Sequence, residues 1–343
     1  MRRPALAAAG LLAAAASVRA ADAPAVHDCL ADPRRIEWIA GGYYEGRFDD
    51  GTPIEANLPA AAPPPVDRPV AVPAAYWFPR TFEGTPNALR VAAPRAPAAP
   101  GEFVLESPDG ARRFEGRFED DGARAVGSFA DAERGIRLRF TLQRHASYRA
   151  VSLGWHARGD AGDPWRWQAL WPELPEAALA ADLRGRAGAC EGALDARRVV
   201  TVAWRDTRTL AVYDDLSVFE DGAAHPEPDA RFVNFAPPSG RPLPLDTFLD
   251  TSPDCLRTVS RFVAARLRDA QAAWPAQGAL RPAGDPTTKE SVGRPWPEAS
   301  ALALPRGLVF SFDPTEVGPY VQGRFRAFAS TADLGKCLKD PAD

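Results

Sequence analysis

Two carboxylates near the end of the chain are the residues whose types and spacing could do chemistry. Asp313 and Glu316 lie three positions apart, between two short apolar runs. Glycoside hydrolases use a pair of carboxyl groups, one as an acid and the other as a base or nucleophile. An aspartate before a proline is also a common turn former, and a glutamate in such a turn can be solvated or salt-bridged. We favour the structural interpretation and keep the acid/base pair as the alternative.

His225 is the best candidate for a general base among the four histidines. It follows a predicted turn, where its ring could accept a proton or hydrogen-bond to the backbone. A nucleophilic triad would also need a serine or cysteine beside that base. The sequence has no Gly-x-Ser-x-Gly motif. We therefore prefer the backbone bond for His225 and favour a protein without catalytic residues.

Aromatic side chains are a third possibility for ligand contact. Trp165 and Trp167 are two positions apart, so they share one face if the chain is extended there. Exposed aromatic rings could stack on the sugars of a cell wall, and Tyr320, on the polar face of a predicted strand, joins them as a binding candidate. Large aromatic residues are more often buried in a core or between domains, which is the interpretation that we favour for the tryptophans.

The four cysteines indicate disulfides. Cys29, Cys190, Cys255 and Cys337 are an even number, which in an oxidising compartment suggests two bridges with three possible pairings. We predict Cys255–Cys337 inside the C-terminal domain and Cys29–Cys190 between the N-terminus and that domain. No C-x-x-C pair or nearby histidine has zinc spacing, so we predict no metal and no cofactor.

Residues 1–20 have the parts of a secretory signal peptide. Arg2 and Arg3 form the positive start, Ala5–Ala16 the apolar stretch, and Val18-Arg19-Ala20 the cleavage site. The apolar stretch is too short to span a bilayer. We expect a periplasmic or secreted protein with no membrane span.

The charge balance limits the class of partner. The chain has 41 basic and 45 acidic residues, hence a formal net charge of −4, and losing the three arginines of residues 1–20 would make it −7. A mildly acidic chain is not typical of proteins that bind nucleic acid or anionic membranes.

Length and patterning predict two domains after the signal peptide. Residues 24–144 read as a β-rich module, because apolar and polar residues alternate along strands such as 136–142. Asp-Gly pairs at 50–51, 109–110 and 121–122 predict hairpin turns, since glycine takes the positive φ that tight turns require. Residues 146–338 read as an α+β domain with an antiparallel sheet. The predicted fold class is therefore α+β with an all-β antiparallel module at its N-terminal end.

A long helix is predicted near 252–272 in the second domain. Ser252 and Pro253 are typical of a helix start. Apolar residues recur on one face and arginines on the other, at Leu256, Val259, Phe262, Val263 and Leu267 against Arg257, Arg261, Arg266 and Arg268. Strands are predicted at 199–204 and 209–219, and the proline-rich residues 276–305 as a surface excursion.

The last predicted element is an antiparallel hairpin over 307–328. Leu308, Phe310 and Phe312 point to one side of its first strand. Its second strand is predicted to bury one apolar face, formed by Val321, Gly323, Phe325 and Ala327.

These C-terminal residues carry a family resemblance. Residues 196–338 resemble an uncharacterised extracytoplasmic domain that is shared by the lysozyme-sensing anti-sigma factor and by a peptidoglycan deacetylase. The likeness lies in three patches, 213–226, 242–249 and 307–334, while Thr315, Ala223 and Ala329 depart from the pattern. The resemblance implies an extracytoplasmic, non-catalytic domain, which in one setting binds lysozyme.

Three functional hypotheses follow. The first is a periplasmic non-catalytic binding or accessory protein that recognises an envelope protein, such as a lysozyme-like partner, or a peptidoglycan component. The second is a hydrolase of cell-wall glycans or peptides that uses Asp313 and Glu316. The third is a structural envelope protein without a small ligand.

Overall fold

The computed structural model describes most of the chain after residue 34. The described residues are 35–60, 62, 64–66, 69–92, 99–155, 165–188, 195–219, 223–237, 239–278, 280–281, 294–295 and 300–339. The predicted signal peptide and the predicted Cys29–Cys190 disulfide lie outside these residues.

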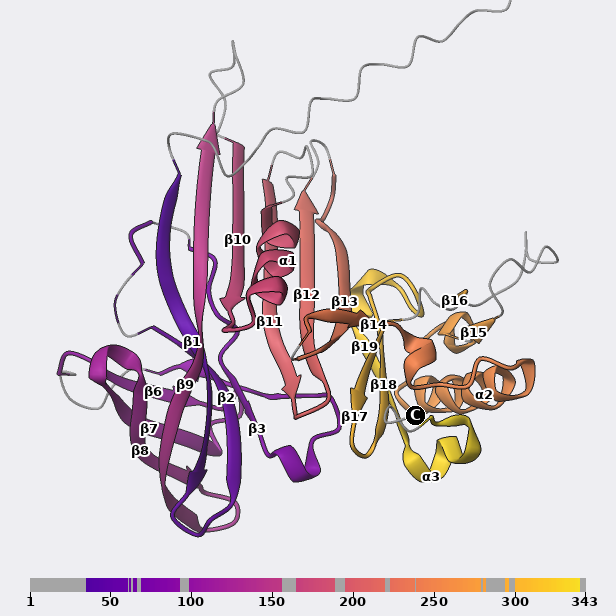
Figure 1. The fold of residues 1–343 in the computed structure, drawn as a ribbon, viewed down its shortest axis with the longest axis horizontal. Helices are drawn as coiled ribbons and strands as arrows, with labels where there is room; N and C mark the ends of the chain where they lie inside the picture. The colour runs from indigo at the N-terminus through magenta and orange to yellow at the C-terminus, as the bar shows by residue number, and fades with distance from the viewer. Residues whose placement is uncertain are drawn as a thin grey trace, which may run out of the picture.

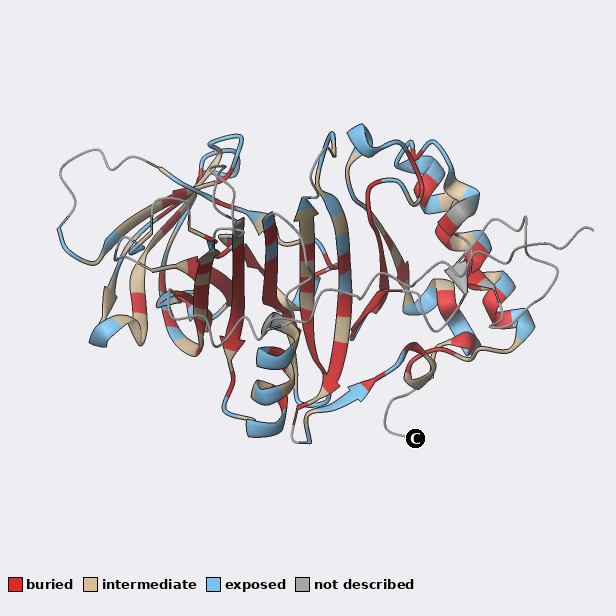
Figure 2. Cartoon of the chain, turned by 90° about the horizontal axis from the view of Figure 1, so that it is seen from above, coloured by how far each residue is buried: buried red, intermediate tan, exposed pale blue. Residues whose placement is uncertain are grey.

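One large sheet forms the body of the molecule (Figure 1). Its strands follow the order β14-β13-β12-β11-β10-β9-β1-β2-β3-β4. Their bounds are β1 Ile36–Phe48, β2 Pro53–Pro59, β3 Ala75–Trp77, β4 Asn87–Ala88, β9 Ile136–Trp155, β10 Trp165–Glu173, β11 Asp195–Arg205, β12 Leu210–Phe219, β13 Glu227–Ala236 and β14 Arg241–Leu243. Figure 2 shows that buried residues run along the middle of these strands.

Strand β9 connects the two ends of this sheet. Its 20 residues pair with β1 on one side, and on the other with β8 (Arg124–Asp131) first and β10 afterwards. Phe140 belongs to the core of the β-module, whereas Tyr148 belongs to the central core. The predicted boundary between residues 144 and 146 thus falls inside β9. Near this point, the buried side chains of β9 change from packing in the core of the β-module to packing in the central core. The division into two domains stays a prediction.

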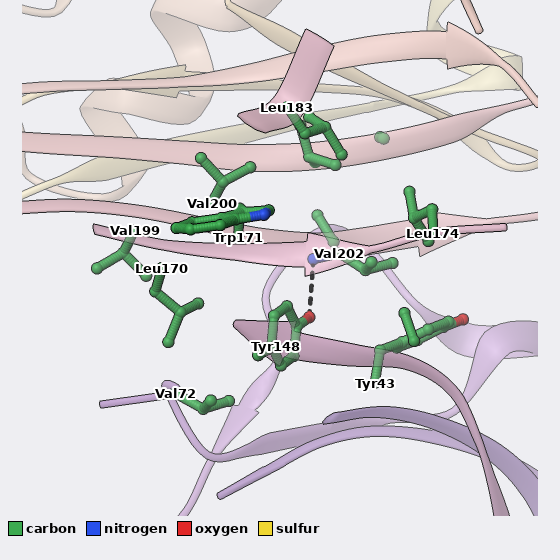
Figure 3. Packing of buried hydrophobic residues seen from close by; sticks show 14 of the residues in the cluster. Tyr43, Val72, Tyr148, Leu170, Trp171, Leu174, Leu183, Val199, Val200 and Val202 are labelled. Atoms are coloured by element: carbon green, nitrogen blue, oxygen red, sulfur yellow. Dashed lines mark hydrogen bonds between the residues drawn. The ribbon is translucent and has the colours of Figure 1, made fainter. Parts of the chain in front are cut away.

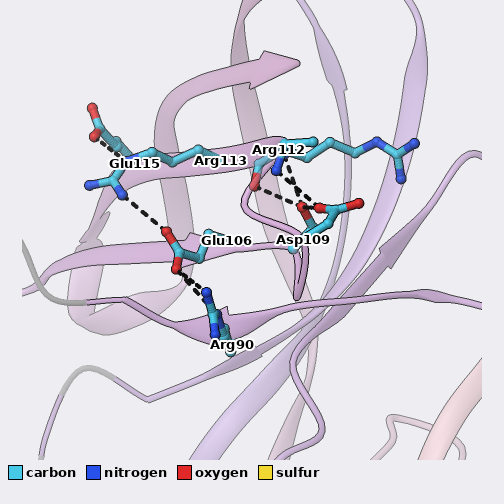
Figure 4. Close-up of polar contacts among 8 residues, drawn as sticks. Arg90, Glu106, Asp109, Arg112, Arg113 and Glu115 are labelled. Carbon is cyan, nitrogen blue, oxygen red and sulfur yellow. Dashed lines mark hydrogen bonds and ion pairs between the residues drawn. The ribbon is translucent and has the colours of Figure 1, made fainter. Parts of the chain in front are cut away.

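The β-module is completed by short antiparallel strands. These are β5 Arg90–Val91, β6 Glu102–Glu106, β7 Arg112–Glu119 and β8. The three predicted hairpin turns are confirmed, because Gly51, Gly110 and Gly122 have φ values of 84°, 74° and 79° and follow β1, β6 and β7. The outer face of β5–β7 carries cross-strand ion pairs of Arg90 and Arg113 with Glu106 (Figure 4). Exposed pairs of this kind add little stability.

Helix α1 (Ala177–Gly188) connects β10 to β11, the two parallel neighbours of the large sheet. A parallel pair needs such a crossover, since a tight turn can join only antiparallel strands. The sequence interpretation contains no helix here. The amphipathic pattern of residues 177–188 is weak, because only Leu179 and Leu183 bury large side chains against the sheet.

The central core is built mainly from buried residues of β1, β9, β10, β11 and β12, and it includes one buried polar connection (Figure 3). The Tyr148 hydroxyl accepts a hydrogen bond from the Val202 N–H (2.9 Å) and donates one to Asn57 Oδ1 (2.6 Å). Asn57 Nδ2 donates to the Val202 carbonyl (3.1 Å). Strand β11 has a register shift between Val202 and Trp204. The two side chains therefore pair the backbone groups of Val202 beside this irregularity.

A second, three-stranded sheet packs beside β13 and carries helices α2 and α3 (Figure 1). Its elements are β17 Ala301–Leu304, β18 Gly307–Phe312, β19 Phe325–Ser330, α2 Pro253–Asp269 and α3 Thr331–Leu334. A two-stranded parallel sheet, β15 Leu280–Arg281 with β16 Arg294–Pro295, lies nearby in sequence. The fold is a sheet-dominated α+β structure, which agrees with the predicted α+β class. The antiparallel sheet predicted for residues 146–338 needs correction, because β10–β11 and β15–β16 are parallel pairs.

The predicted helix is confirmed as α2, with Leu256, Val259, Val263 and Leu267 buried. It ends at Asp269, shortly before the predicted end. Cys255 and Cys337 are paired, as predicted, with Cα atoms 5.4 Å apart, a separation that suits a disulfide. Within the described residues, no helix is long and apolar enough to cross a membrane.

Two sequence predictions for this region need correction. Val321 is 90% exposed instead of buried, because residues Tyr320–Gln322 form a 3-10 turn after Pro319 and β19 begins only at Phe325. Residues 301–304, assigned to the surface excursion, form the buried strand β17. They pair with β18, whose residues are all buried because the central core covers one face and the α2 core covers the other.

Candidate functional site

One predicted site residue, Tyr320, lines a groove of about 510 Å³, and Asp313 and His225 each contact a residue that lines it. The groove lies between the strand ends of β11–β13 and the connection from β18 to β19. We call it the Arg324 groove. Its lining residues are Arg197, Val199, Asp215, Ser217, Pro228, Pro314, Tyr320, Gly323 and Arg324.

The large sheet positions one wall of the groove through its register. Arg197 lies opposite Ser217, and Val199 lies opposite Asp215. Directly opposite residues in an antiparallel pair point to the same face, so these side chains form a continuous patch. Pro228 extends it onto β13, where it pairs with Ser217.

The β18–β19 connection forms the other wall through a local turn. The Glu316 carboxylate accepts a hydrogen bond from the Asp313 N–H, and the Glu316 N–H donates to the Asp313 carbonyl (3.2 Å). Thr315 has φ 80° and Gly323 has φ 73°, so the chain turns back twice before β19. These turns bring Tyr320 and Arg324 to the groove.

Arg324 connects the two walls by charge-assisted hydrogen bonds. Its Nη1 and Nη2 atoms donate to the two oxygens of Asp215 at 3.1 and 2.6 Å. Its Nε donates to Asp313 Oδ1 at 3.1 Å. Burial alone would lower the pKa of Arg324, but the charge of Asp215 and the hydrogen bonds raise it. Arg324 therefore stays charged and crosslinks segments that are 109 residues apart.

Asp313 fixes the edge of β13 with its second oxygen. Asp313 Oδ2 accepts a hydrogen bond from the Ala230 N–H at 2.7 Å, and the residue is only 7% exposed. Burial raises the pKa of Asp313, while the Ala230 N–H and Arg324 oppose this effect. Both oxygens of Asp313 are thus bonded within the protein. This geometry favours the structural interpretation of Asp313 and Glu316 over the acid/base pair.

His225 and Tyr320 form a stacked pair at the rim. Their ring centroids are 4.0 Å apart, with 15° between the ring planes. His225 Nδ1 lies 3.2 Å from the Pro226 carbonyl oxygen, which agrees with the backbone bond that we preferred. Tyr320 is 37% exposed and His225 is exposed, so the stacked pair is accessible to solvent.

Arg197 adds an available cation to this surface. It is exposed, and no described residue forms an ion pair with it. Arg197 lies on the same face of the sheet as Asp215. The Asp215 carboxylate already accepts hydrogen bonds from Arg324. A ligand in the groove would therefore meet one free guanidinium and one pair of stacked rings.

Trp167 does not contribute to the groove. Trp167 is 1% exposed and belongs to the central core, so it cannot be an exposed platform and the core interpretation describes it. The side chain of Trp165 lies outside the described part of the structure. Sequence reasoning did not single out Arg197, Asp215 or Arg324, because only the register of distant strands brings them together.

No metal site is found in the described part of the chain. There, no three His, Cys, Asp or Glu side chains gather in a way that could hold a metal ion.

Comparison with known proteins identifies no function. No family model matches the chain, and no curated protein matches it. The solved structures that are similar to this chain include two from one family. A DUF3298 family protein from Bacteroides fragilis has a TM-score of 0.41 and 12% identity, over 57% of this chain and 94% of that one. A DUF3298 family protein from Pseudomonas aeruginosa has a TM-score of 0.37 and 15% identity, over 56% of this chain and 94% of that one.

Both neighbours thus come from an uncharacterised domain family. The comparisons give no link to the anti-sigma factor or to the deacetylase.

Proposed function

We propose that this protein is a non-catalytic binding protein of the cell envelope, and that the Arg324 groove recognises a peptidoglycan component. The observation that carries the proposal is the exposed Tyr320–His225 stack beside an unpaired Arg197 at one groove. Aromatic side chains offer a flat apolar surface with a polar tip, which suits the apolar face of a sugar. A guanidinium binds carboxylates with directional hydrogen bonds. Peptidoglycan fragments combine sugar rings with carboxylates, so they offer both contacts.

The bonding of the two carboxylates supports a binding role over hydrolysis. A general acid must be able to reach the bond that it protonates. Both oxygens of Asp313 are held by Ala230 and Arg324, and Glu316 holds the Asp313 N–H. A retained ligand, and not a cleaved one, is the expected outcome.

An extracytoplasmic location is part of the proposal. The Cys255–Cys337 pair is compatible with an oxidising compartment, and the first twenty residues have the pattern of a signal peptide. Mass spectrometry of the exported protein would give its N-terminus and its disulfides. A retained N-terminus with reduced cysteines would contradict this location.

Calorimetric titration with soluble muropeptides tests the ligand. We expect Tyr320→Ala and Arg197→Gln each to weaken binding by about ten-fold. Val321→Ala is the matched control, because Val321 is 90% exposed on the same turn and does not line the groove. Absence of binding by the wild type, or equal loss in the control, would contradict the proposal.

Two further arms separate the other hypotheses. Release of soluble products that stops in Asp313→Asn would favour the hydrolase. If the protein binds lysozyme but no muropeptide, and Tyr320→Ala weakens the binding of lysozyme, the ligand of the groove is a lysozyme-like protein and not a glycan. Binding of neither would favour a structural envelope protein.

A further inference from the structure

A second and larger hollow of about 1070 Å³ lies between the β-module and the second sheet. We call it the module cleft. One side is built from module loops, namely the β1–β2 turn, the 3-10 turn Pro79–Thr81 and the β8–β9 turn. The other side is the face of β19 that carries Arg326 and Phe328. Its volume reaches the upper end of the range of ligand pockets, about 300–1,000 Å³.

The inner polar groups of the module cleft already have partners within the protein. Asp131 is 4% exposed and accepts a hydrogen bond from the Arg134 N–H at 3.1 Å. The Arg112 Nε lies 3.5 Å from Asp131, and Arg112 Nη1 donates to Asn87 Oδ1 at 3.3 Å. Arg326 donates to the Gly84 carbonyl at 2.6 Å. These groups form the floor of the cleft, and each of them is already held by a contact within the protein.

Two outer arginines are different. Arg80 is exposed, and no ion-pair partner is found for it among the described residues. The Arg134 side chain is 70% exposed, and its Nε lies 3.9 Å from Asp131. Of the two other acids that line the cleft, Glu83 lies 3.3 Å from Arg306, and Asp50 accepts the Thr52 N–H at 2.8 Å and keeps its charge. The open part of the cleft therefore offers cations from two separate loops.

The accessible apolar surface of the module cleft comes from Ile136 and from three half-buried side chains. Ile136 is 37% exposed, and Phe78, Leu138 and Phe328 are half-buried. The deeper rings are buried, with Tyr76 at 1% exposure. Sugars need an accessible ring face, which the Arg324 groove provides through Tyr320. Aliphatic or aromatic side chains of a peptide can instead pack on Ile136 and Phe78.

From this pattern we propose that the module cleft binds a short acidic segment of a partner protein that carries apolar side chains between its carboxylates. The carboxylates pair with Arg80 and Arg134, for which a guanidinium is well suited. The apolar side chains cover Ile136. This site is distinct from the Arg324 groove, and its ligand is a peptide and not a glycan.

Selection from a random decapeptide phage library tests the proposal on the exported full-length protein. Wild-type protein is expected to enrich peptides with Asp or Glu next to Leu, Ile or Phe. One enriched peptide is then synthesised with fluorescein and titrated by anisotropy. The double variant Arg80→Glu/Arg134→Glu should weaken its binding by at least about ten-fold, and Ile136→Ser should weaken it less.

The controls keep this result separate from folding and from the groove. Arg137→Glu/Arg139→Glu makes the same charge change at two exposed β9 arginines that do not line the cleft, and it should retain binding. Tyr320→Ala should also retain it, whatever the muropeptide result. Enriched peptides without acidic residues, no enrichment over bare resin, or equal affinity of the Arg80→Glu/Arg134→Glu variant would overturn the proposal.

Discussion

Buried polar side chains set the behaviour of this protein at the scale of single residues. Glu55 on β2 is 7% exposed and accepts hydrogen bonds from the Tyr43 hydroxyl (2.8 Å) and the Trp77 Nε1–H (2.9 Å). Burial raises the pKa of Glu55 to about 7, although Tyr43 and Trp77 oppose it, and the charges of Glu45 and Arg205 act in opposite directions. Its ionised form is therefore costly in the folded state.

A pH dependence follows from Glu55. The folded pKa is about 7 and the unfolded value 4.5, so its stabilisation is complete below the unfolded pKa and is lost as the pH rises through 7. Each unit corresponds to about 1.4 kcal/mol, which gives a loss of roughly 3 kcal/mol. Glu55→Gln still accepts both bonds and should remove this slope in urea unfolding between about pH 5 and pH 8.5. Glu133 is an exposed turn residue, so the control variant Glu133→Gln should keep the wild-type slope. If Glu55→Gln has an equally steep slope, Glu55 is not the cause of the pH dependence.

Asp313 is expected to matter for stability and not for turnover. Asp313→Ala removes the acceptor of the Ala230 N–H and one partner of Arg324. Loss of a buried acceptor with its charged partner costs about 2–3 kcal/mol. Chemical denaturation should show this loss, while Asp229→Ala, an exposed change next to Ala230, should cost under about 0.5 kcal/mol. Wild-type stability of Asp313→Ala would contradict its structural role.

The strands show a similar dependence on polar side chains at the scale of elements. Hydrogen bonds between backbone groups and polar side chains connect strand β13 to the second sheet. Its Phe232 N–H donates to Ser300 Oγ (2.7 Å), and Asn234 Nδ2 donates to the Ala301 carbonyl (2.7 Å). Together with Asp313, these bonds cover backbone groups of an edge that would otherwise be unpaired. Two sheets are therefore joined without a continuous ladder.

The Tyr148 connection is the element-scale feature most open to test. Tyr148→Phe leaves the buried Val202 N–H and one Asn57 oxygen without their partner. A buried unsatisfied group costs about 1–3 kcal/mol, so we expect a loss near 3 kcal/mol and faster amide exchange at Val202. Tyr44→Phe is the matched control, because that hydroxyl donates only to the part-buried Gly122 carbonyl (2.7 Å). If both variants lose the same stability, the special role of Tyr148 is refuted.

At the scale of the whole molecule, one loop docks the β-module onto the second sheet. Gly84 has φ 84°, and a Cβ atom there would lie 2.4 Å from Val309 Cγ2. The Gly84 carbonyl accepts a hydrogen bond from Arg326, and the neighbouring Glu83 pairs with Arg306. The width of the module cleft therefore depends on this contact.

Gly84→Ala should loosen that contact. Positive φ costs an alanine about 1–2 kcal/mol, and the overlap with Val309 adds about 1–3 kcal/mol. Gly51→Ala is the control for the backbone effect alone, because Gly51 also has φ 84° but no atom within 4 Å of its Cβ position. The difference between the two variants therefore measures the overlap with Val309. Hydrogen exchange should rise in residues 79–86 and in β18 only for Gly84→Ala. Equal exchange in the two variants would show that the loop does not hold the module.

The sequence alone predicted the elements whose signals are local. The Asp-Gly turns, the face of α2 and strand β12 follow from a positive φ or a repeat within a few residues, and these predictions are confirmed. The Cys255–Cys337 pairing was also foreseen. The turns, the α2 face and β12 depend on chemistry that neighbours in the chain share, whereas the disulfide joins residues 82 positions apart and follows from the cysteine count in an oxidising compartment.

The tertiary structure decided everything that depends on register between distant segments. Tyr320 and His225 were candidates on separate grounds, yet only the docking of the β18–β19 turn onto β13 stacks them and pairs Arg324 with Asp215. Helix α1, strand β17 and the exposure of Val321 escaped prediction because their neighbours in space, and not their local pattern, determine what they bury. Local propensity specifies turns and periodic faces, whereas a site made by two sheets exists only after long-range packing has aligned them.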